Sequence, residues 1–180
     1  MNALHLLPLG DTRVDLVDDL LAPLEGVFHI PAARVRREID LERFYDDDRA
    51  QYNSTSLLLH MKDLYRNGGD NPAVTAIAIV PCDLFIPILT YVFGEAEVGG
   101  NVAVVSSYRL APERYGLPPD AGLYAERLFK EVVHELGHVR GLVHCLTQEC
   151  VMHSSSYVED IDLKGRRFCQ ACAELIARPH

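Results

Sequence analysis

The stretch from Glu131 to Met152, EVVHELGHVRGLVHCLTQECVM, constrains this chain more than any other part. His134 and His138 are four residues apart, so on a helix both side chains lie on one face and can bind a single metal ion. Gly141 suits a helix end, because glycine adopts the left-handed conformation without a steric penalty. A bend there can bring His144 to the same ion and leave a fourth position open. The spacing therefore predicts a helix and turn that form a catalytic zinc site.

Glu135 lies between the first two histidines in the sequence but points beside them on a helix. A carboxylate in that place suits a general base that takes a proton from water. An amphipathic helix with histidines packed into a core is the alternative interpretation. It explains neither Gly141 nor His144, so the complete pattern HExxHxxGxxH favours zinc.

Four cysteines follow the histidines, at Cys145, Cys150, Cys169 and Cys172. Two cysteine pairs are typical of a structural zinc site, in which four thiolates exclude water. Two disulfides are the alternative. The chain begins MNALHLLPLGDTRVD, which lacks the pattern of a secretory signal peptide, so we expect a cytoplasmic protein with reduced thiols that can bind metal. The fifth cysteine, Cys82, lies in an apolar run and is expected to be a buried thiol.

The whole pattern HExxHxxGxxHCxxxxCxM, with a CxxC further on, resembles the archaemetzincins, a branch of the metzincin-type zinc peptidases. The match covers the C-terminal third of the chain, and every pattern position is occupied. The resemblance implies a catalytic zinc on the three histidines and Glu135 as the base. It also implies Met152 in a methionine turn beneath the site and a second, structural zinc on the four cysteines.

Length and charge limit the other possibilities. A chain of 180 residues with 48% hydrophobic residues fits one globular domain, 1–180, with a sizeable core. The formal net charge of −9 disfavours binding to nucleic acid or to an anionic membrane. The longest apolar stretch, Ala73–Leu89, is interrupted by two prolines and an aspartate and is too short to cross a bilayer. We therefore expect no nucleic acid or membrane partner, and the oligomeric state is left open.

Hydrophobic periodicity in the first half of the chain predicts alternating strands and helices. The expected elements are a strand at Ala3–Leu9, a helix between Asp11 and Gly26, a strand at Val27–Ile30, a charged and solvated segment at Arg34–Arg49, a helix at Ser54–Arg66 and a central buried strand at Ala73–Phe85.

The segments Tyr91–Gly100 and Val102–Leu110 both have strand character and are separated by glycines, which predicts an antiparallel hairpin at the sheet edge. Peptidases commonly bind substrate as an added strand. This part of the chain also resembles the segment of archaemetzincins before the active-site helix. Phe93, Gly94 and Glu95 are therefore candidate substrate-binding residues, with a purely structural hairpin as the alternative.

The rest of the chain is expected to form a loop at Ala111–Ala121, the active-site helix at Tyr124–Val139, a polar loop after Met152 and a terminal helix at Phe168–Ala177 that carries the CxxC. Arg140 is a second candidate substrate-binding residue, which would cover the open metal position or bind a substrate carboxylate.

These features predict an α/β (α+β) fold with a mixed twisted sheet, a metzincin-like active-site helix and a C-terminal helix stapled by zinc. The expected function is a zinc metallopeptidase that acts on peptide or protein substrates through zinc-activated water, with Glu135 as the base. The resemblance suggests aminopeptidase-like cleavage as one form of this activity. The alternatives are a zinc amidase of small substrates and a non-catalytic zinc-binding scaffold.

Overall fold

The computed structural model describes residues 2–67 and 74–177. The strands are β1 (Ala3–Pro8), β2 (Ala32–Arg34), β3 (Tyr45–Asp46), β4 (Gln51–Asn53), β5 (Val74–Val80), β6 (Leu84–Phe85), β7 (Gly94–Ala96) and β8 (Val102–Ser106). The helices are α1 (Val14–Phe28), α2 (Ser54–Asn67), α3 (Ala121–Val139), α4 (Val158–Leu163) and α5 (Gln170–Ile176). Short 3-10 turns form η1 (Leu41–Phe44), η2 (Tyr108–Leu110) and η3 (Pro112–Tyr115).

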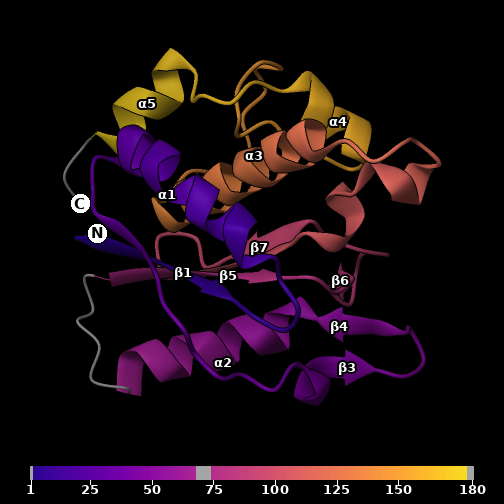
Figure 1. Ribbon diagram of the computed structural model, residues 1–180. Coiled ribbons are helices and arrows are strands. Elements are labelled where there is room, and N and C mark those ends of the chain that lie inside the picture. Colours follow the sequence, from indigo (N-terminus) through magenta and orange to yellow (C-terminus); the bar gives the residue numbers. More distant parts are fainter. Residues whose placement is uncertain (1, 68–73, 178–180) are drawn as a thin grey trace.

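A five-stranded sheet of order β2-β1-β5-β8-β7 lies between two layers (Figure 1). Helices α1, α3, α4 and α5 cover one face, and α2 covers the other face together with a three-stranded sheet of order β3-β4-β6. The fold is therefore the mixed α/β fold that the sequence predicted. No helix in the described ranges is long and apolar enough to cross a membrane.

Strand β5 is the centre of the large sheet, as predicted. It is parallel to both of its neighbours, β1 and β8. Its side chains alternate between two cores: Ile77 and Ile79 pack under α1 and α3, whereas Ala76, Ala78 and Val80 pack over α2. A strand covered on both faces reads as a continuous apolar run, which explains why the sequence identified it.

The predicted hairpin is also confirmed, with shorter strands. Strand β7 pairs antiparallel with β8 and lies at the end of the sheet order, so one side of β7 has no strand partner among the described residues. The remainder of the predicted second strand forms the turn η2. The hairpin therefore places an open backbone edge beside α3.

Two predictions for the first half were wrong. Helix α1 continues past Gly26 and ends at His29, which adopts the left-handed conformation (φ 55°), so Val27 and Phe28 are helical. The second strand instead forms after Pro31, at Ala32–Arg34. Glycine weakens a helix without ending it when the next residues still pack against the core.

The segment predicted as a solvated loop, 34–49, contains η1 and β3, and Phe44 within it is buried. The predicted long strand at 73–85 is divided at Pro81, which has no backbone N–H for a sheet, and Leu84 and Phe85 join the smaller sheet instead. Gly68, Gly69 and Ala73, expected to end α2 and begin β5, lie outside the described residues.

The segment after Met152 was predicted as a loop but contains α4. Val158 and Ile161 are spaced three apart and are buried against α3. The side chain of Asp160 accepts hydrogen bonds from the backbone N–H groups of Ser156 (2.8 Å) and Tyr157 (2.9 Å), which satisfies the start of the helix. The sequence prediction missed this helix because most of the segment is polar and only Val158 and Ile161 pack against the core.

Candidate metal centre and active-site cleft

Helix α3 and the turn after it bring the three predicted histidines together. The helix begins at Asp120, whose side chain accepts from the backbone of Leu123, and ends before Gly141, which has a φ of 85°. The left-handed glycine turns the chain back, as predicted. One ring nitrogen from each of His134, His138 and His144 lies within 4.8 Å of the others.

The hydrogen bonds of the rings orient their free nitrogens. The Nδ1 atoms of His134 and His138 lie 2.8 Å from the backbone carbonyls of Val151 and Leu142. A carbonyl only accepts, so both Nδ1 atoms carry the proton and both Nε2 atoms have a lone pair. These two Nε2 atoms face each other at 3.1 Å, where two acceptors repel unless a cation lies between them.

The geometry and charge of this cluster fit a zinc ion. Two nitrogens on a tetrahedral zinc, with bonds of about 2.0–2.1 Å, are about 3.3 Å apart. Burial lowers the pKa of His134 well below its usual value and also lowers the pKa of His138 and of His144. All three rings are therefore neutral near pH 7, which is the form that binds metal.

Glu135 is buried in the same helix, with 4% of its surface exposed. Its Oε2 atom has no hydrogen-bond partner within the described part of the chain. Burial raises the pKa of Glu135 well above its usual range, and the nearby charge of Glu131 adds to this effect. A buried carboxylate with a raised pKa and an unused oxygen is suited to take up a proton and release it again.

Two glycines make room for the side chains of the site. A Cβ on Gly94 in β7 would lie 2.6 Å from Oε1 of Glu135, so the strand and the carboxylate touch. A Cβ on Gly137 would lie 2.3 Å from the sulfur of Met152. Met152 is fully buried and packs beneath α3 between the helix and the C-terminal segment, where the sequence placed the methionine turn.

The four cysteines Cys145, Cys150, Cys169 and Cys172 also meet, with their sulfurs within 4.8 Å of one another and no disulfide between them. The sulfurs of Cys145 and Cys169 are 3.8 Å apart. Tetrahedral zinc with Zn–S bonds of about 2.3 Å has S···S separations of about 3.8 Å. The backbone amide of Cys172 lowers the pKa of Cys169 to about 7, which favours its thiolate. The cluster therefore fits a closed zinc site.

Cys82 is far from both clusters in the sequence and is one of the residues packed against the core under α2. Burial raises the pKa of its thiol to about 12. The thiol is partly exposed, not fully buried as predicted, but its raised pKa makes it unreactive.

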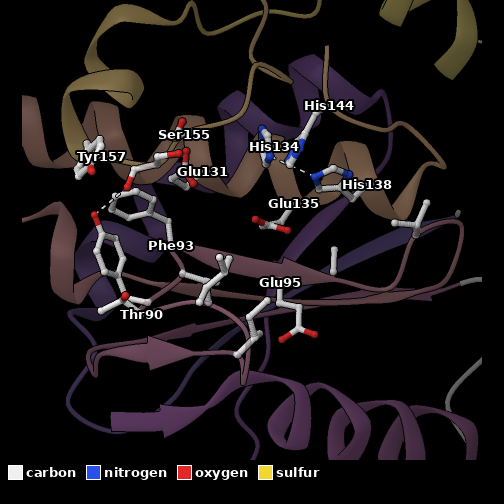
Figure 2. A pocket seen from close by; sticks show the side chains of 18 residues that line it. Thr90, Phe93, Glu95, Glu131, His134, Glu135, His138, His144, Ser155 and Tyr157 are labelled. Atoms are coloured by element: carbon white, nitrogen blue, oxygen red, sulfur yellow. Dashed lines mark hydrogen bonds between the residues drawn. The ribbon is translucent and has the colours of Figure 1, made fainter. Parts of the chain in front are cut away.

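A cleft of about 600 Å³ runs along α3 between the helix and strand β7 (Figure 2). Its lining includes the three histidines and Glu135, together with the predicted substrate-binding residues Phe93, Gly94 and Glu95. The Glu95 side chain itself turns toward α2, where it accepts hydrogen bonds from the hydroxyls of Ser54 and Thr55. Glu95 therefore offers its backbone to the cleft and keeps its charge away from it.

The pairing of β7 shows which backbone groups face the cleft. Just outside the two ends of β7, Ser106 donates to the carbonyl of Phe93 and Glu97 donates to the carbonyl of Val102. In an antiparallel pair every second residue bonds to the partner strand, and the residues that alternate with these point their N–H and C=O groups to the other side. Gly94 and Ala96 therefore present their backbone groups to the open edge.

Arg140 lies elsewhere. It is not among the described residues that line the cleft. Its guanidinium donates to the carbonyl of Ile176 at the end of α5, at 2.8 Å. The sequence predicted a place over the metal or against a substrate carboxylate, whereas the structure places the guanidinium at a helix C-terminus. It ties α5, and with it the cysteine cluster, to the end of α3.

Sequence reasoning missed a buried ion pair beside the histidines. Lys164 and Glu131 are 2.7 Å apart, with side chains 1% and 3% exposed. The same ammonium lies 3.5 Å from Nδ1 of His134 and from the carbonyl of His153. The position of Glu131, one helical turn before Glu135 on the same face, was a usable signal. Lys164 gave none, since it follows a helix that was predicted as a loop.

Comparisons with known proteins agree with this arrangement. The profile of Peptidase family M54 matches residues 16–178. The chain is 36% identical over 177 residues to an archaemetzincin of Pyrococcus abyssi, which covers 96% of this chain and 93% of that protein. The structure of a zinc-dependent peptidase from Methanocorpusculum labreanum matches with a TM-score of 0.86 at 28% identity, over 96% of this chain and 99% of that chain.

The structure of an archaemetzincin from Methanopyrus kandleri matches with a TM-score of 0.83 at 32% identity, over 97% of this chain and 93% of that chain. Fold and sequence therefore agree over almost the whole length. The chain belongs to the archaemetzincins of peptidase family M54, as the pattern of its histidines and cysteines predicted.

Proposed function

We propose that this peptidase hydrolyses peptide bonds with one zinc ion on His134, His138 and His144 and with Glu135 as the general base. The observation that carries the proposal is the pair of Nε2 lone pairs facing each other at 3.1 Å in neutral rings, next to a buried carboxylate with an unpartnered oxygen. When bound, the zinc ion would polarise the substrate carbonyl and lower the pKa of water to about 7.

The side chains and backbone of the protein supply the remaining steps. Gly94 and Ala96 hold the substrate as an added strand through their outward backbone groups, which places its backbone along the histidine cluster. Glu135 takes a proton from the attacking water and returns it to the leaving amine, since its raised pKa suits both directions. Burial on the cleft floor keeps competing water away from this carboxylate.

We also propose a second zinc ion, a structural one, on the four cysteines. Cys145 directly follows His144, and the N–H of Cys145 donates to the carbonyl of Met152 at 2.9 Å. A metal at Cys145 would therefore fix the loop that carries the third histidine and hold it against α5. Reduced thiols in this cluster favour a cytoplasmic location, where they stay free to bind metal.

The test is to compare Glu135→Gln with the parent protein after loading both with zinc. We measure metal per chain by mass spectrometry and hydrolysis with a mixed peptide library. The parent should hold two zinc ions and cleave peptides, and Glu135→Gln should keep both ions while its rate falls by about 10²–10⁴-fold. Glu113→Gln, at an exposed position outside the cleft lining, is the matched control. Equal rates in Glu135→Gln and the parent would remove Glu135 from the mechanism.

A further inference from the structure

A hydrogen bond spans one end of the cleft. The hydroxyl of Tyr91 donates to the backbone carbonyl of Ser156 at 2.8 Å. Tyr91 precedes β7, and Ser156 lies in the loop between Met152 and α4, so the bond joins two walls that are far apart in the sequence. Both residues line the cleft. We call this contact the Tyr91–Ser156 bridge.

The tyrosine side of the bridge is held in place by a charged cluster. The guanidinium carbon of Arg109 lies 3.8 Å from the centre of the Tyr91 ring. Arg109 in turn makes two hydrogen bonds of 2.6 Å to the carboxylate of Asp83. Gln51 also donates to the carbonyl of Thr90, next to the tyrosine, at 3.0 Å. The ring is therefore fixed before any substrate arrives.

The serine side of the bridge is equally constrained. The backbone N–H of Ser156 donates to the carboxylate of Asp160 in α4, at 2.8 Å. Helix α4 is anchored to α3 by the ion pair between Asp162 and Arg127, whose guanidinium also donates to the carbonyl of Leu110. The hydrogen bond therefore joins two walls that other contacts already hold in place. Closing the cleft in this way costs little conformational entropy, because neither wall has to become ordered first.

The bridge lies at a defined end of the substrate path. Figure 2 shows Tyr157, Ser155, Glu131 and Phe93 together on one side of the cleft and His138 on the other. The bridge lies on the side of Tyr157, because Ser156 stands between Ser155 and Tyr157 in the chain.

Strand pairing gives the direction of the substrate. Antiparallel pairs are the more stable kind, so a peptide added to β7 runs from Ala96 toward Gly94. The bond to be cleaved lies near Gly94, because that residue touches Glu135. Residues after the cleaved bond then extend toward Tyr91. Tyr91 is three residues before Gly94, so the backbone between them spans at most about 10 Å, which is the length of about three extended substrate residues.

We propose that the Tyr91–Ser156 bridge closes the cleft and makes Tyr91 a specificity-determining residue, which limits good substrates to about three residues beyond the cleaved bond. The inference rests on the proposed function and adds a substrate class to it: peptides cut close to their carboxyl end. The amino side of the substrate runs toward His138 and does not meet this bridge.

The experiment uses the zinc-loaded protein and two peptide series built around one bond that the library shows to be cleaved. One series adds one to six residues after that bond, and the other adds them before it. We measure kcat/KM for each peptide. In the parent protein, kcat/KM should fall by at least about 10-fold once the carboxyl side exceeds about three residues, whereas the Tyr91 hydroxyl should not affect the dependence on amino-side length.

Tyr91→Phe removes the hydroxyl that makes the bridge and keeps the ring, so the decrease of its kcat/KM with length on the carboxyl side should become smaller. Tyr52→Phe is the matched control, because the Tyr52 hydroxyl donates to Glu42 outside the cleft, and it should keep the full decrease. A parent protein that accepts long carboxyl extensions, or a Tyr91→Phe variant with an unchanged decrease, would overturn the inference.

A second measurement separates the inference from the proposed function. Fluorescence anisotropy with dye-labelled members of both series reports binding whether or not a bond is cut. Weaker binding of peptides with long carboxyl extensions, relieved in Tyr91→Phe, supports the closed end. Length-independent binding contradicts it, even if every peptide is cleaved. If no peptide is cleaved, the proposed hydrolysis fails while the closure is still decided by binding.

Discussion

Gly94 and Glu135 are in direct contact across the cleft: a Cβ at position 94 would lie 2.6 Å from Oε1 and 2.8 Å from the carboxyl carbon. A side chain on β7 at this point must therefore displace the carboxylate. The position of the proposed base Glu135 therefore depends on the lack of a side chain at residue 94 of the edge strand.

Gly94→Ala should reduce activity without removing either metal. The added methyl group displaces Glu135 by a fraction of an ångström or more, and we expect kcat to fall by at least about 10-fold. Gly26→Ala is the control, since nothing lies within 4 Å of a Cβ there. Metal analysis and peptide hydrolysis check the result, and full activity in Gly94→Ala would show that the carboxylate can shift harmlessly.

Loss of one cysteine should release the structural metal. Cys169→Ser removes one sulfur from the cluster, and the metal content should fall from two zinc ions per chain to one. Since the cluster holds α5 and the loop after His144, the midpoint of thermal unfolding should fall by at least about 4 °C. Cys82→Ser, which alters a thiol outside the cluster, should keep both ions. Unchanged metal content in Cys169→Ser would argue against the four-thiolate site.

Removing one partner of the buried Lys164–Glu131 ion pair should destabilise the fold strongly, whereas replacing both charges should destabilise it little. Lys164→Met leaves the carboxylate of Glu131 uncompensated in the core and should lower the free energy of unfolding by about 3–5 kcal/mol. The double variant Glu131→Gln/Lys164→Met removes both charges and should recover most of this loss. Urea unfolding followed by circular dichroism measures both values. Equal destabilisation of the single and double variants would mean that the lysine acts through packing alone.

Gly141→Ala tests the turn that delivers His144. An alanine at a φ of 85° is strained by about 1–3 kcal/mol, and the chain can relieve this strain by opening the turn. Zinc affinity at the histidine site should therefore weaken, while the cysteine site keeps its metal. Competition with a chromogenic chelator measures both affinities separately. A histidine site of undiminished affinity would show that the loop tolerates the new backbone.

Asp160 should contribute to the pH dependence of stability. The backbone N–H groups of Tyr157 and Ser156 lower the pKa of its carboxyl. Stability from a depressed pKa is present above the unfolded value, about 3.9, and is lost as the pH falls through the folded value. The difference in unfolding free energy between the parent and Asp160→Ala should therefore be larger at pH 6 than at pH 3. Urea titrations at both pH values check this, and a difference that grows in acid would contradict it.

The metal clusters could be predicted from the sequence because their geometry is largely local. The spacing of His134 and His138 alone places them on one helix face, and Gly141 indicates the turn that brings His144 back toward them. The cysteines needed a tertiary step, yet their paired spacing is itself a known solution to four-coordinate binding. Strand β5 was identifiable because a strand buried on both faces has a continuous apolar sequence.

The features that were missed depend on contacts between distant segments. Arg140 looked like a cleft residue by its place in the motif, but the carbonyl of Ile176, 36 residues later, accepts its hydrogen bond. Lys164 reaches Glu131 only because α4 folds back over α3. The Tyr91–Ser156 bridge joins residues 65 apart. No local periodicity encodes such pairs, so only a three-dimensional structure reveals them.

Strand β7 keeps one row of backbone groups available, and such a row invites a neighbouring molecule of the same protein to attach. The strand is only three residues long. The acidic side chains of Glu95 in the strand and of Glu97 just after it are held on the α2 side by Thr55 and Lys62. A short, sheltered edge of this kind can receive one passing polypeptide but gives identical copies too little length to polymerise. The protein can thus keep an open strand edge for substrate without aggregating through that edge.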